Sequence, residues 1–410
     1  MTVASHTGSD PIWRIPMPPR AAVRATIARG LFVRTVRGLR DAPLRVVLPD
    51  GAIAAEGRPG APVMTITRDA FFHRLAAAGK IGFGEAYMAG DWTADDLAAT
   101  MGAFAAHVER LLPGPLQRLR RLYEPRMPAQ QRNTIAGAAR NVASHYDLSN
   151  DLFAAFLDPT MTYSAAVFEP GDTLETAQSR KYEALCRLVD LGPSDNLLEI
   201  GTGWGGFAIH AASTRGCRVT TATISRAQAE LARARVAAAG LSDRVEVLLC
   251  DYREIERRPS KIVSIEMLEA VGEEYWPVFF ATCDRLLGPG GSIGLQTITM
   301  PHRRYLASRH AYTWIHKYIF PGGLIPSREA IDRALHDAST LRVTHHGEIG
   351  HHYATTLRMW RQRFLAQRER VHSLGFDHTF VRMWEFYLAY CEAGFATGAL
   401  GNAQLRLART

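Results

Sequence analysis

Two glutamates, Glu266 and Glu269, lie three residues apart in the apolar stretch "VSIEMLEAVG" (residues 263–272). A buried carboxylate is costly unless it is paired, and burial raises its pKa. Two carboxylates about 6 Å apart at an effective dielectric constant near 20 repel by about 3 kcal/mol, so one can stay protonated while the other ionises. The pair is therefore a candidate for proton transfer. The structural alternative is a Glu266 carboxylate that simply bonds to the backbone or to an arginine.

A glycine-rich turn precedes this pair. The stretch "LLEIGTGWGG" (197–206) places Gly201, Gly203 and Gly206 between a strand-like and a helix-like segment, with Glu199 directly before the turn. Glycine lets the backbone approach a cofactor where a Cβ would clash. A dinucleotide site also requires an acid about 20 residues further on, but residues 219–229 contain none. The turn favours S-adenosylmethionine over a nicotinamide cofactor.

The elements that would position these residues alternate from about residue 180 onward. We expect strands at 196–201, 217–224, 244–252, 260–267 and 290–299, and helices at 176–191, 205–216, 225–240 and 275–287. This alternation predicts an α/β fold with a parallel, doubly wound Rossmann-like sheet. Glu199 directly before the glycine turn is typical of the class I methyltransferase type of this fold. Ligands bind beyond the carboxyl ends of such strands, where the chain places Gly201, Thr223, Asp251, Glu266 and Gln296.

The N-terminal part has a different pattern. Residues 44–66 read as two or three short strands, and 68–79 and 94–112 read as helices with Asp91 and Trp92 in the turn between them. We therefore expect a small α+β domain at 1–112, a linker at 113–140 and the methyltransferase domain at 141–410. The linker assignment rests on its four prolines and many arginines.

Charge suggests what the N-terminal domain binds. The chain of 410 residues has a net charge of +8, and residues 1–40 contain seven arginines but one acid, Asp10. Apolar residues recur between these arginines at roughly helical spacing, namely Val23, Ile27, Leu31 and Val36. A basic amphipathic helix can bind an anionic bilayer surface, while a helix packed only on its own domain is the alternative. Because stacking aromatic residues are lacking here, we expect no nucleic acid partner.

Other features exclude some classes of protein. The sequence has no run of about 18 apolar residues and no secretory signal pattern, so we expect neither a transmembrane helix nor secretion. Five scattered cysteines suit a reducing cytoplasm. Four histidines, at 345, 346, 351 and 352, form a cluster for which we expect a loop rather than a metal site. Helical segments at 359–371 and 380–395 would line an acyl channel or simply pack in the core.

Several motifs, in the same order along the chain, resemble the cyclopropane-fatty-acyl-phospholipid synthase family. They are "HYDLSNDLFAAFLDPTMTYS" (145–164), "EIGTGWGG", "TISRAQ" (223–228), "DYR" (251–253), "SIEMLEAVG" and "WIHKYIFPGGLIPS" (314–327). The resemblance covers about residues 80–400. The stretches "GFGEAYMAGDW", "TMPHRRYLASRH" and "KYIFPGGLIPS" are most similar to the actinobacterial branch that makes 10-methylene or 10-methyl fatty acids.

The resemblance implies S-adenosylmethionine as cofactor. The residues implied to surround it are Tyr163, Ser164, Glu199, Gly201, Gly203, Trp204, Thr223, Ile224, Gln228, Asp251, Tyr252 and Ile265. Thr223, Ile224 and Gln228 would reach the ribose, which explains the missing acid. His145 and Tyr146 are expected at the substrate.

The resemblance also implies a reaction centre formed by Glu269, Glu266, Tyr353 and Gln296. Family members commonly hold bicarbonate as a base, gripped by a cysteine, a histidine, a glutamate, a tyrosine and a backbone group near an isoleucine. Glu269, Ile298 and Tyr353 match this pattern, but Ala165 replaces the cysteine and Gln296 the histidine. Glu266 stands where several cyclopropane-forming relatives have glycine. Either Glu266 supplements or replaces bicarbonate as the base, or bicarbonate still binds, more weakly.

The expected reaction is methyl transfer to the cis double bond of an unsaturated acyl chain on a phospholipid, which gives a 10-methylene fatty acid through a carbocation. Cyclopropane formation on the same substrate is the alternative product. Two other classes stay open, a small-molecule N- or O-methyltransferase and a non-catalytic lipid-binding protein. We expect a cytoplasmic protein peripheral to the inner face of the membrane, with a separate reductase acting on the product. Assembly as a homodimer stays open.

Overall fold

The computed structural model describes residues 13–18, 21–107, 128, 131, 133–134, 137 and 149–409. These residues separate into two compact units. The first contains the described part of 1–122 together with Thr313–Ile319 and Arg368–Tyr390, and the second contains the rest. The division predicted from the sequence placed the two later segments with the methyltransferase part. It was wrong for them because they pack with the N-terminal residues: the Trp314 ring, for example, leaves no room for a side chain at Gly84.

The first unit has a four-stranded sheet in the order β2-β1-β3-β4. Its strands are β1 (Arg45–Val47), β2 (Ile53–Ala55), β3 (Val63–Ile66) and β4 (Trp92–Ala94), of which β1 and β3 are parallel. Helices α1 (Ala22–Arg37), α2 (Ala70–Met88), α3 (Leu97–His107), α14 (Trp314–Tyr318) and α17 (Arg368–Ser373) belong to the same unit, as does α18 (His378–Ala396) through Tyr390. Aromatic side chains such as Phe71, Phe72 and Trp92 form its core.

Two or three short strands were predicted within residues 44–66, and the structure has three there. Two other expectations for this unit were wrong. Trp92 begins strand β4 instead of lying in a turn, and its buried ring packs on Tyr87. Helix α2 continues to Met88 past the expected end at Gly79, where a φ of 52° produces a kink. Only glycine takes up such a φ without strain, so the helix bends and resumes there.

The second unit contains a seven-stranded sheet in the order β10-β11-β9-β8-β5-β6-β7. The strands are β5 (Asn196–Ile200), β6 (Arg218–Thr223), β7 (Val245–Leu249), β8 (Lys261–Ile265), β9 (Ser292–Thr299), β10 (Leu341–Glu348) and β11 (Gly401–Arg409). Strands β5 to β9 are parallel, which confirms the predicted alternation. Strand β11 runs antiparallel between β9 and β10 and was not predicted.

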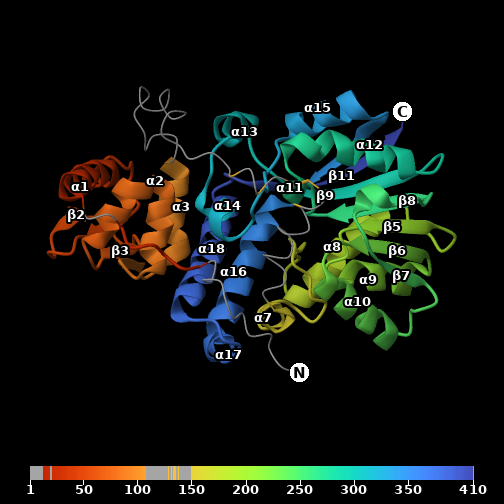
Figure 1. Ribbon diagram of the computed structural model, residues 1–410, viewed down its shortest axis with the longest axis horizontal. Coiled ribbons are helices and arrows are strands. Elements are labelled where there is room, and N and C mark those ends of the chain that lie inside the picture. The colour runs from red at the N-terminus through yellow and green to blue at the C-terminus, as the bar shows by residue number, and fades with distance from the viewer. Residues whose placement is uncertain are drawn as a thin grey trace. The chain divides into compact units, whose positions relative to one another are not determined.

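Two apolar cores lie on opposite faces of this sheet. Neighbouring residues in a strand point to opposite faces, and Leu197 and Val263 belong to one core while Leu198 and Ile262 belong to the other. Helices α8 (Leu174–Leu188), α9 (Gly206–Arg215) and α10 (Arg226–Ala238) cover the first face (Figure 1). Helices α12 (Trp276–Leu286) and α15 (Arg328–Ala338) cover the second. This is the doubly wound α/β fold that the sequence predicts.

The remaining elements of this unit are short, apart from one helix. They are α7 (Asn150–Ala154), α11 (Leu268–Val271), α13 (His302–Ser308) and α16 (Gly350–Ala366), with single turns at Tyr252–Glu254 and Glu273–Tyr275. The four clustered histidines were expected in a loop, which was wrong, because 345 and 346 lie in β10 and 351 and 352 in α16. Among the described residues no histidine, cysteine or acidic cluster could hold a metal ion. None of the described helices is both long and apolar enough to cross a bilayer.

Candidate active site

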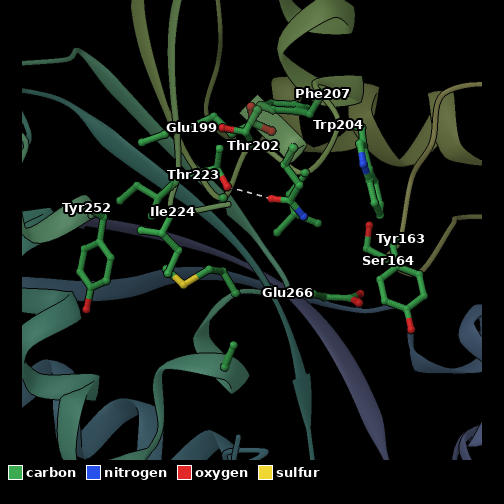
Figure 2. Close-up of a pocket in the computed structure, with 18 of the residues that line it drawn as sticks. Tyr163, Ser164, Glu199, Thr202, Trp204, Phe207, Thr223, Ile224, Tyr252 and Glu266 are labelled. Atoms are coloured by element: carbon green, nitrogen blue, oxygen red, sulfur yellow. Dashed lines mark hydrogen bonds between the residues drawn. The ribbon is translucent and has the colours of Figure 1, made fainter. Parts of the chain in front are cut away.

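The carboxyl ends of β5, β6, β7 and β8 open onto one cavity of the second unit. Its lining includes every residue predicted to surround the cofactor, and Glu266 as well. Tyr163, Ser164 and Trp204 lie on one side of the cavity, and Ile224 and Tyr252 on the other (Figure 2). The topology therefore brings together residues that are up to 103 positions apart in the sequence, between Tyr163 and Glu266.

The glycine turn forms the floor of this cavity. Gly201 and Gly203 have φ angles of 101° and 51°, which side chains rarely adopt. Glu199 is buried beneath them and accepts a hydrogen bond of 2.6 Å from the Thr221 hydroxyl. Burial raises the pKa of Glu199 to about 8. The turn therefore lets the protein backbone come close to a bound cofactor, as expected.

The side of the cavity that would face the ribose and the adenine ring of the cofactor lies beyond the ends of β6 and β7. The Thr223 hydroxyl donates to the Gln228 side-chain oxygen at 2.8 Å, and no acid lies at this end of β6 (Figure 2). Asp251 is buried and forms an ion pair with Arg253 at 2.6 Å, next to Tyr252. Hydroxyl, amide and carboxylate groups are available here for the hydroxyls of a nucleoside, so the residues fit the predicted cofactor.

Trp204 and Tyr163 close the other side of the cavity with aromatic rings. The Trp204 indole donates to Asn150 at 2.8 Å, and the Tyr163 ring stacks on Trp360 with centroids 5.2 Å apart. Ser164 follows in the same loop, and its hydroxyl accepts a hydrogen bond of 2.7 Å from Lys181. This loop therefore lines the cavity with the Tyr163 ring, and the next residue, Ser164, is held by its hydrogen bond to Lys181.

Glu266 follows the last residue of β8 in a left-handed conformation with a φ of 51°. Its carboxylate accepts four hydrogen bonds, on Oε1 from the Ala165 amide (3.0 Å), Gln296 (2.9 Å) and Asn402 (2.6 Å), and on Oε2 from the Tyr353 hydroxyl (2.7 Å). Gln296 is fixed in turn by Gln404 at 2.9 Å. Hydrogen bonds thus connect three of the four residues predicted at the reaction centre, namely Glu266, Gln296 and Tyr353.

Glu269 lies in a different environment although it is only three residues away. Its Oε1 accepts hydrogen bonds from the Thr297 hydroxyl at 3.0 Å and from the Ile298 amide. Its buried Oε2 has no hydrogen-bond partner among the described residues. Burial and, second, the charge of Glu266 raise the pKa of Glu269 to about 8. Glu266 lines the cofactor cavity, whereas Glu269 does not.

Two predicted substrate residues, His145 and Tyr146, lie outside the described residues. Three polar residues were missed by the sequence analysis, namely Lys181, Asn402 and Asn133. Lys181 lies within the buried face of α8, and a lysine at an apolar helix position was a readable signal. Asn133 donates to the carbonyl groups of Ala270 and Gly322. Neither asparagine follows a pattern that single-sequence reading could detect.

Comparison with known proteins places this geometry in a family. The profile described as mycolic acid cyclopropane synthetase matches residues 133–405. The chain belongs to this family. It is 47% identical to the tuberculostearic acid methyltransferase of Mycobacterium tuberculosis, over 97% of this chain and 94% of that protein. It is 35% identical to the cyclopropane-fatty-acyl-phospholipid synthase of Escherichia coli, over 85% of this chain and 88% of that protein.

A solved structure of the family agrees with the fold. Mycolic acid cyclopropane synthase CmaA1, complexed with S-adenosylhomocysteine, superposes with a TM-score of 0.61 at 31% identity, over 66% of this chain and 97% of that one. The family resemblance, the class I methyltransferase fold and S-adenosylmethionine as cofactor are therefore confirmed. The protein is an S-adenosylmethionine-dependent methyltransferase of the fatty-acyl type.

The raised pKa of Glu269 predicts a pH effect on stability. Between its ordinary pKa of 4.5 and about 8, the unfolded chain ionises this carboxyl while the folded protein keeps it protonated. Stability is therefore lost as the pH rises through this window. Glu269→Gln should make the decline of Tm between pH 5 and pH 8 shallower by at least about 2 °C. Differential scanning calorimetry measures this, with Glu246→Gln at the exposed edge strand β7 as control. An unchanged slope would contradict a protonated Glu269.

Proposed function

We propose that the protein transfers the methyl group of S-adenosylmethionine to the cis double bond of an unsaturated acyl chain on a phospholipid, and forms a 10-methylene fatty acid. The similarity to a tuberculostearic acid methyltransferase supports this reaction. The observation that carries it is the Glu266 carboxylate, anchored at four points where the cofactor cavity ends. The twelve cavity residues predicted to surround the cofactor are proposed to bind it.

The bonding of Glu266 suits it to act as the base. A carboxylate has about four acceptor positions, and Oε1 already takes three donors whereas Oε2 takes only one. Oε2 is therefore the atom that can receive a proton. One departure from the bicarbonate pattern serves this carboxylate directly, since the Gln296 side chain donates to it, and the backbone amide of Ala165 donates to it as well. These contacts support the hypothesis that Glu266 replaces bicarbonate.

The chemistry requires a base and a dry site. When bound, S-adenosylmethionine supplies an electrophilic methyl group, and its transfer to the alkene leaves a cation on the acyl chain. A hydride shift moves this cation to the carbon that carries the new methyl, and loss of a proton from that methyl to Glu266 gives the methylene. The aromatic rings of Tyr163, Trp360 and Tyr353 beside the carboxylate would exclude water that could trap the cation. Reduction to a methyl branch would then need a hydride from a separate reductase.

Glu269 is proposed to stay protonated and to act beside the base. Its raised pKa follows from burial and from the anion three residues away, so the two carboxyl groups divide into a neutral and an ionised partner. Cyclopropane formation is the second candidate, favoured by the similarity to the Escherichia coli synthase. It needs the same cation and the same base, but the proton leaves before any hydride shift.

The first experiment measures the product. We expect that wild-type protein incubated with S-adenosylmethionine and oleoyl phospholipid vesicles adds 14 mass units, the net gain of one CH2 group, to the acyl chain. Catalytic hydrogenation under mild conditions, followed by mass spectrometry, distinguishes the products because a methylene takes up hydrogen and a cyclopropane resists it. A resistant product would establish the cyclopropane alternative. No mass gain on any unsaturated phospholipid would contradict both.

A second experiment tests the base. Glu266→Gln keeps the shape of the side chain but removes the proton acceptor, so kcat should fall by about 100-fold or more. Wild-type turnover should be the same in bicarbonate-free buffer and with bicarbonate added, measured as S-adenosylhomocysteine release. Glu246→Gln serves as the surface control. Loss of wild-type activity on removal of bicarbonate would show that the borrowed ion is still the base.

We further propose that α1 binds an anionic bilayer. Its residues Val23, Ile27 and Leu31 are 75%, 57% and 55% exposed, and the i, i+4, i+8 spacing puts them in one row. Phe32 and Val36 pack into the unit from the opposite side of the helix. Arg24 and Arg34 flank the exposed row at i+3 and i+7 spacing, and α1 contains no acidic residue. An apolar row between cations suits the boundary between acyl chains and anionic headgroups.

Vesicle binding tests this surface. The variant Val23→Ser/Ile27→Ser/Leu31→Ser should bind phosphatidylglycerol vesicles at least about tenfold more weakly than wild type in a sedimentation assay, because three apolar side chains no longer leave water. The variant Val278→Ser/Leu306→Ser removes exposed apolar side chains of the second unit, 41% and 50% exposed, and should bind like wild type. If the triple variant binds the vesicles as tightly as wild type does, the proposal that α1 binds the bilayer is wrong.

A further inference from the structure

Lys181 is a fully buried cation that the reaction described above does not use. It lies on α8 with none of its surface exposed. Among the described residues its only hydrogen bond is to the Ser164 hydroxyl at 2.7 Å, and its ammonium also lies 4.3 Å from the centre of the Tyr182 ring. No carboxylate lies within ion-pair distance in the part of the chain that the structure describes. An apolar side chain would fill this position on the helix at lower cost.

The charges around Lys181 are mostly negative. Burial lowers its pKa to about 7, and the nearby carboxylates oppose this shift, with Glu266 the strongest, followed by Asp158 and Glu199. His210 on α9 and the Tyr182 phenol also face it. The buried ammonium therefore counters a cluster of carboxylates at the inner wall of the cofactor cavity without pairing with any one of them.

Lys181 is connected to Glu266 through two consecutive residues of one loop, Ser164 and Ala165. Gln178 and Lys181, three residues apart on α8, hold the Ser164 carbonyl and hydroxyl at 2.9 Å and 2.7 Å. The next residue, Ala165, donates its amide to Glu266. One face of α8 thus fixes the loop that carries both a cavity wall and a donor to the Glu266 carboxylate.

We propose that Lys181 is a positioning residue that holds the 163–165 loop in place and supplies the buried positive charge that keeps Glu266 ionised between turnovers. This inference rests on the proposed role of Glu266 as the base. A carbocation is so strong an acid that its base needs to be ionised rather than strongly basic. The Lys181 ammonium, while it is protonated, meets that need, because it favours the carboxylate over the carboxylic acid and promotes release of the captured proton.

Three variants separate the two roles. Lys181→Met removes the donor and the charge with little change in volume, and Lys181→Gln removes the charge but keeps a neutral donor on a side chain that is one atom shorter. Arg187→Met, a matched control, removes an exposed cation from the same helix. Two quantities are measured for each folded variant, the Kd of S-adenosylhomocysteine by calorimetry and the pH dependence of kcat on oleoyl phospholipid.

We expect Lys181→Met to weaken S-adenosylhomocysteine binding about tenfold, because a charge-assisted hydrogen bond to the loop is lost. Lys181→Gln should bind within about threefold of wild type. Both should move the acidic limb of the pH–kcat profile upward by about one pH unit, the effect of unit charges about 10 Å apart at an effective dielectric constant near 20. Arg187→Met should change neither quantity.

A folded Lys181→Gln with the wild-type acidic limb would overturn the charge role, and wild-type affinity in Lys181→Met would overturn the loop role. If neither variant folds, Gln178→Leu leaves the ammonium in place, removes the other α8 donor to Ser164 and tests the loop contact by affinity alone, and an unchanged Kd would again count against it. Absence of wild-type turnover on unsaturated phospholipid would instead contradict the proposed function, while the binding measurements would still decide the loop role.

Discussion

The arrangement of the second unit around its cavity depends on one half-buried anion, the Glu266 carboxylate. An anion removed from water is tolerated only when donors replace the lost hydration. The four donors come from four separate parts of the chain: the loop at Ala165, strand β9 at Gln296, helix α16 at Tyr353 and strand β11 at Asn402. Each donor reaches the carboxylate only if its own element is in register. The anion therefore couples the antiparallel end of the sheet to the loop beside the cofactor cavity.

Two glutamates three residues apart show how surroundings, not sequence distance, decide the behaviour of a carboxyl group. Donors surround Glu266, whereas Glu269 has one buried oxygen without a partner among the described residues and a pKa raised to about 8. The group with fewer donors is the one whose pKa is raised, so Glu269 is the partner that keeps its proton. A pair with similar surroundings would share one proton and leave the position of the base undefined. In the proposed reaction, this asymmetry would leave one defined atom, Glu266 Oε2, as the base.

Local periodicity was enough to predict the parallel strands, the glycine turn and the polar residues that follow each strand, because a strand's carboxyl end is set by its neighbours in sequence. Thr223, Asp251 and Glu266 lie in the cavity for that reason. Contacts between distant segments could not be predicted in this way. Strand β11 pairs antiparallel with β9, and Asn402 meets Glu266 across 136 positions, so neither contact has a local signal. Trp92 began a strand because pairing with β3 overrode its turn-like surroundings.

Glu266 has two costs that a glycine at the same position would avoid. Its φ of 51° is a left-handed conformation that strains a residue with a side chain by about 1–3 kcal/mol, and its charge is partly removed from water. Only two residues separate the end of β8 from α11, so the chain must turn sharply there and a glycine would turn freely. A structural role in holding the loop or β11 could be filled by uncharged groups elsewhere. Strain and charge combined in one residue, at the end of the cofactor cavity, are therefore better explained by chemistry at the carboxylate than by stability of the fold.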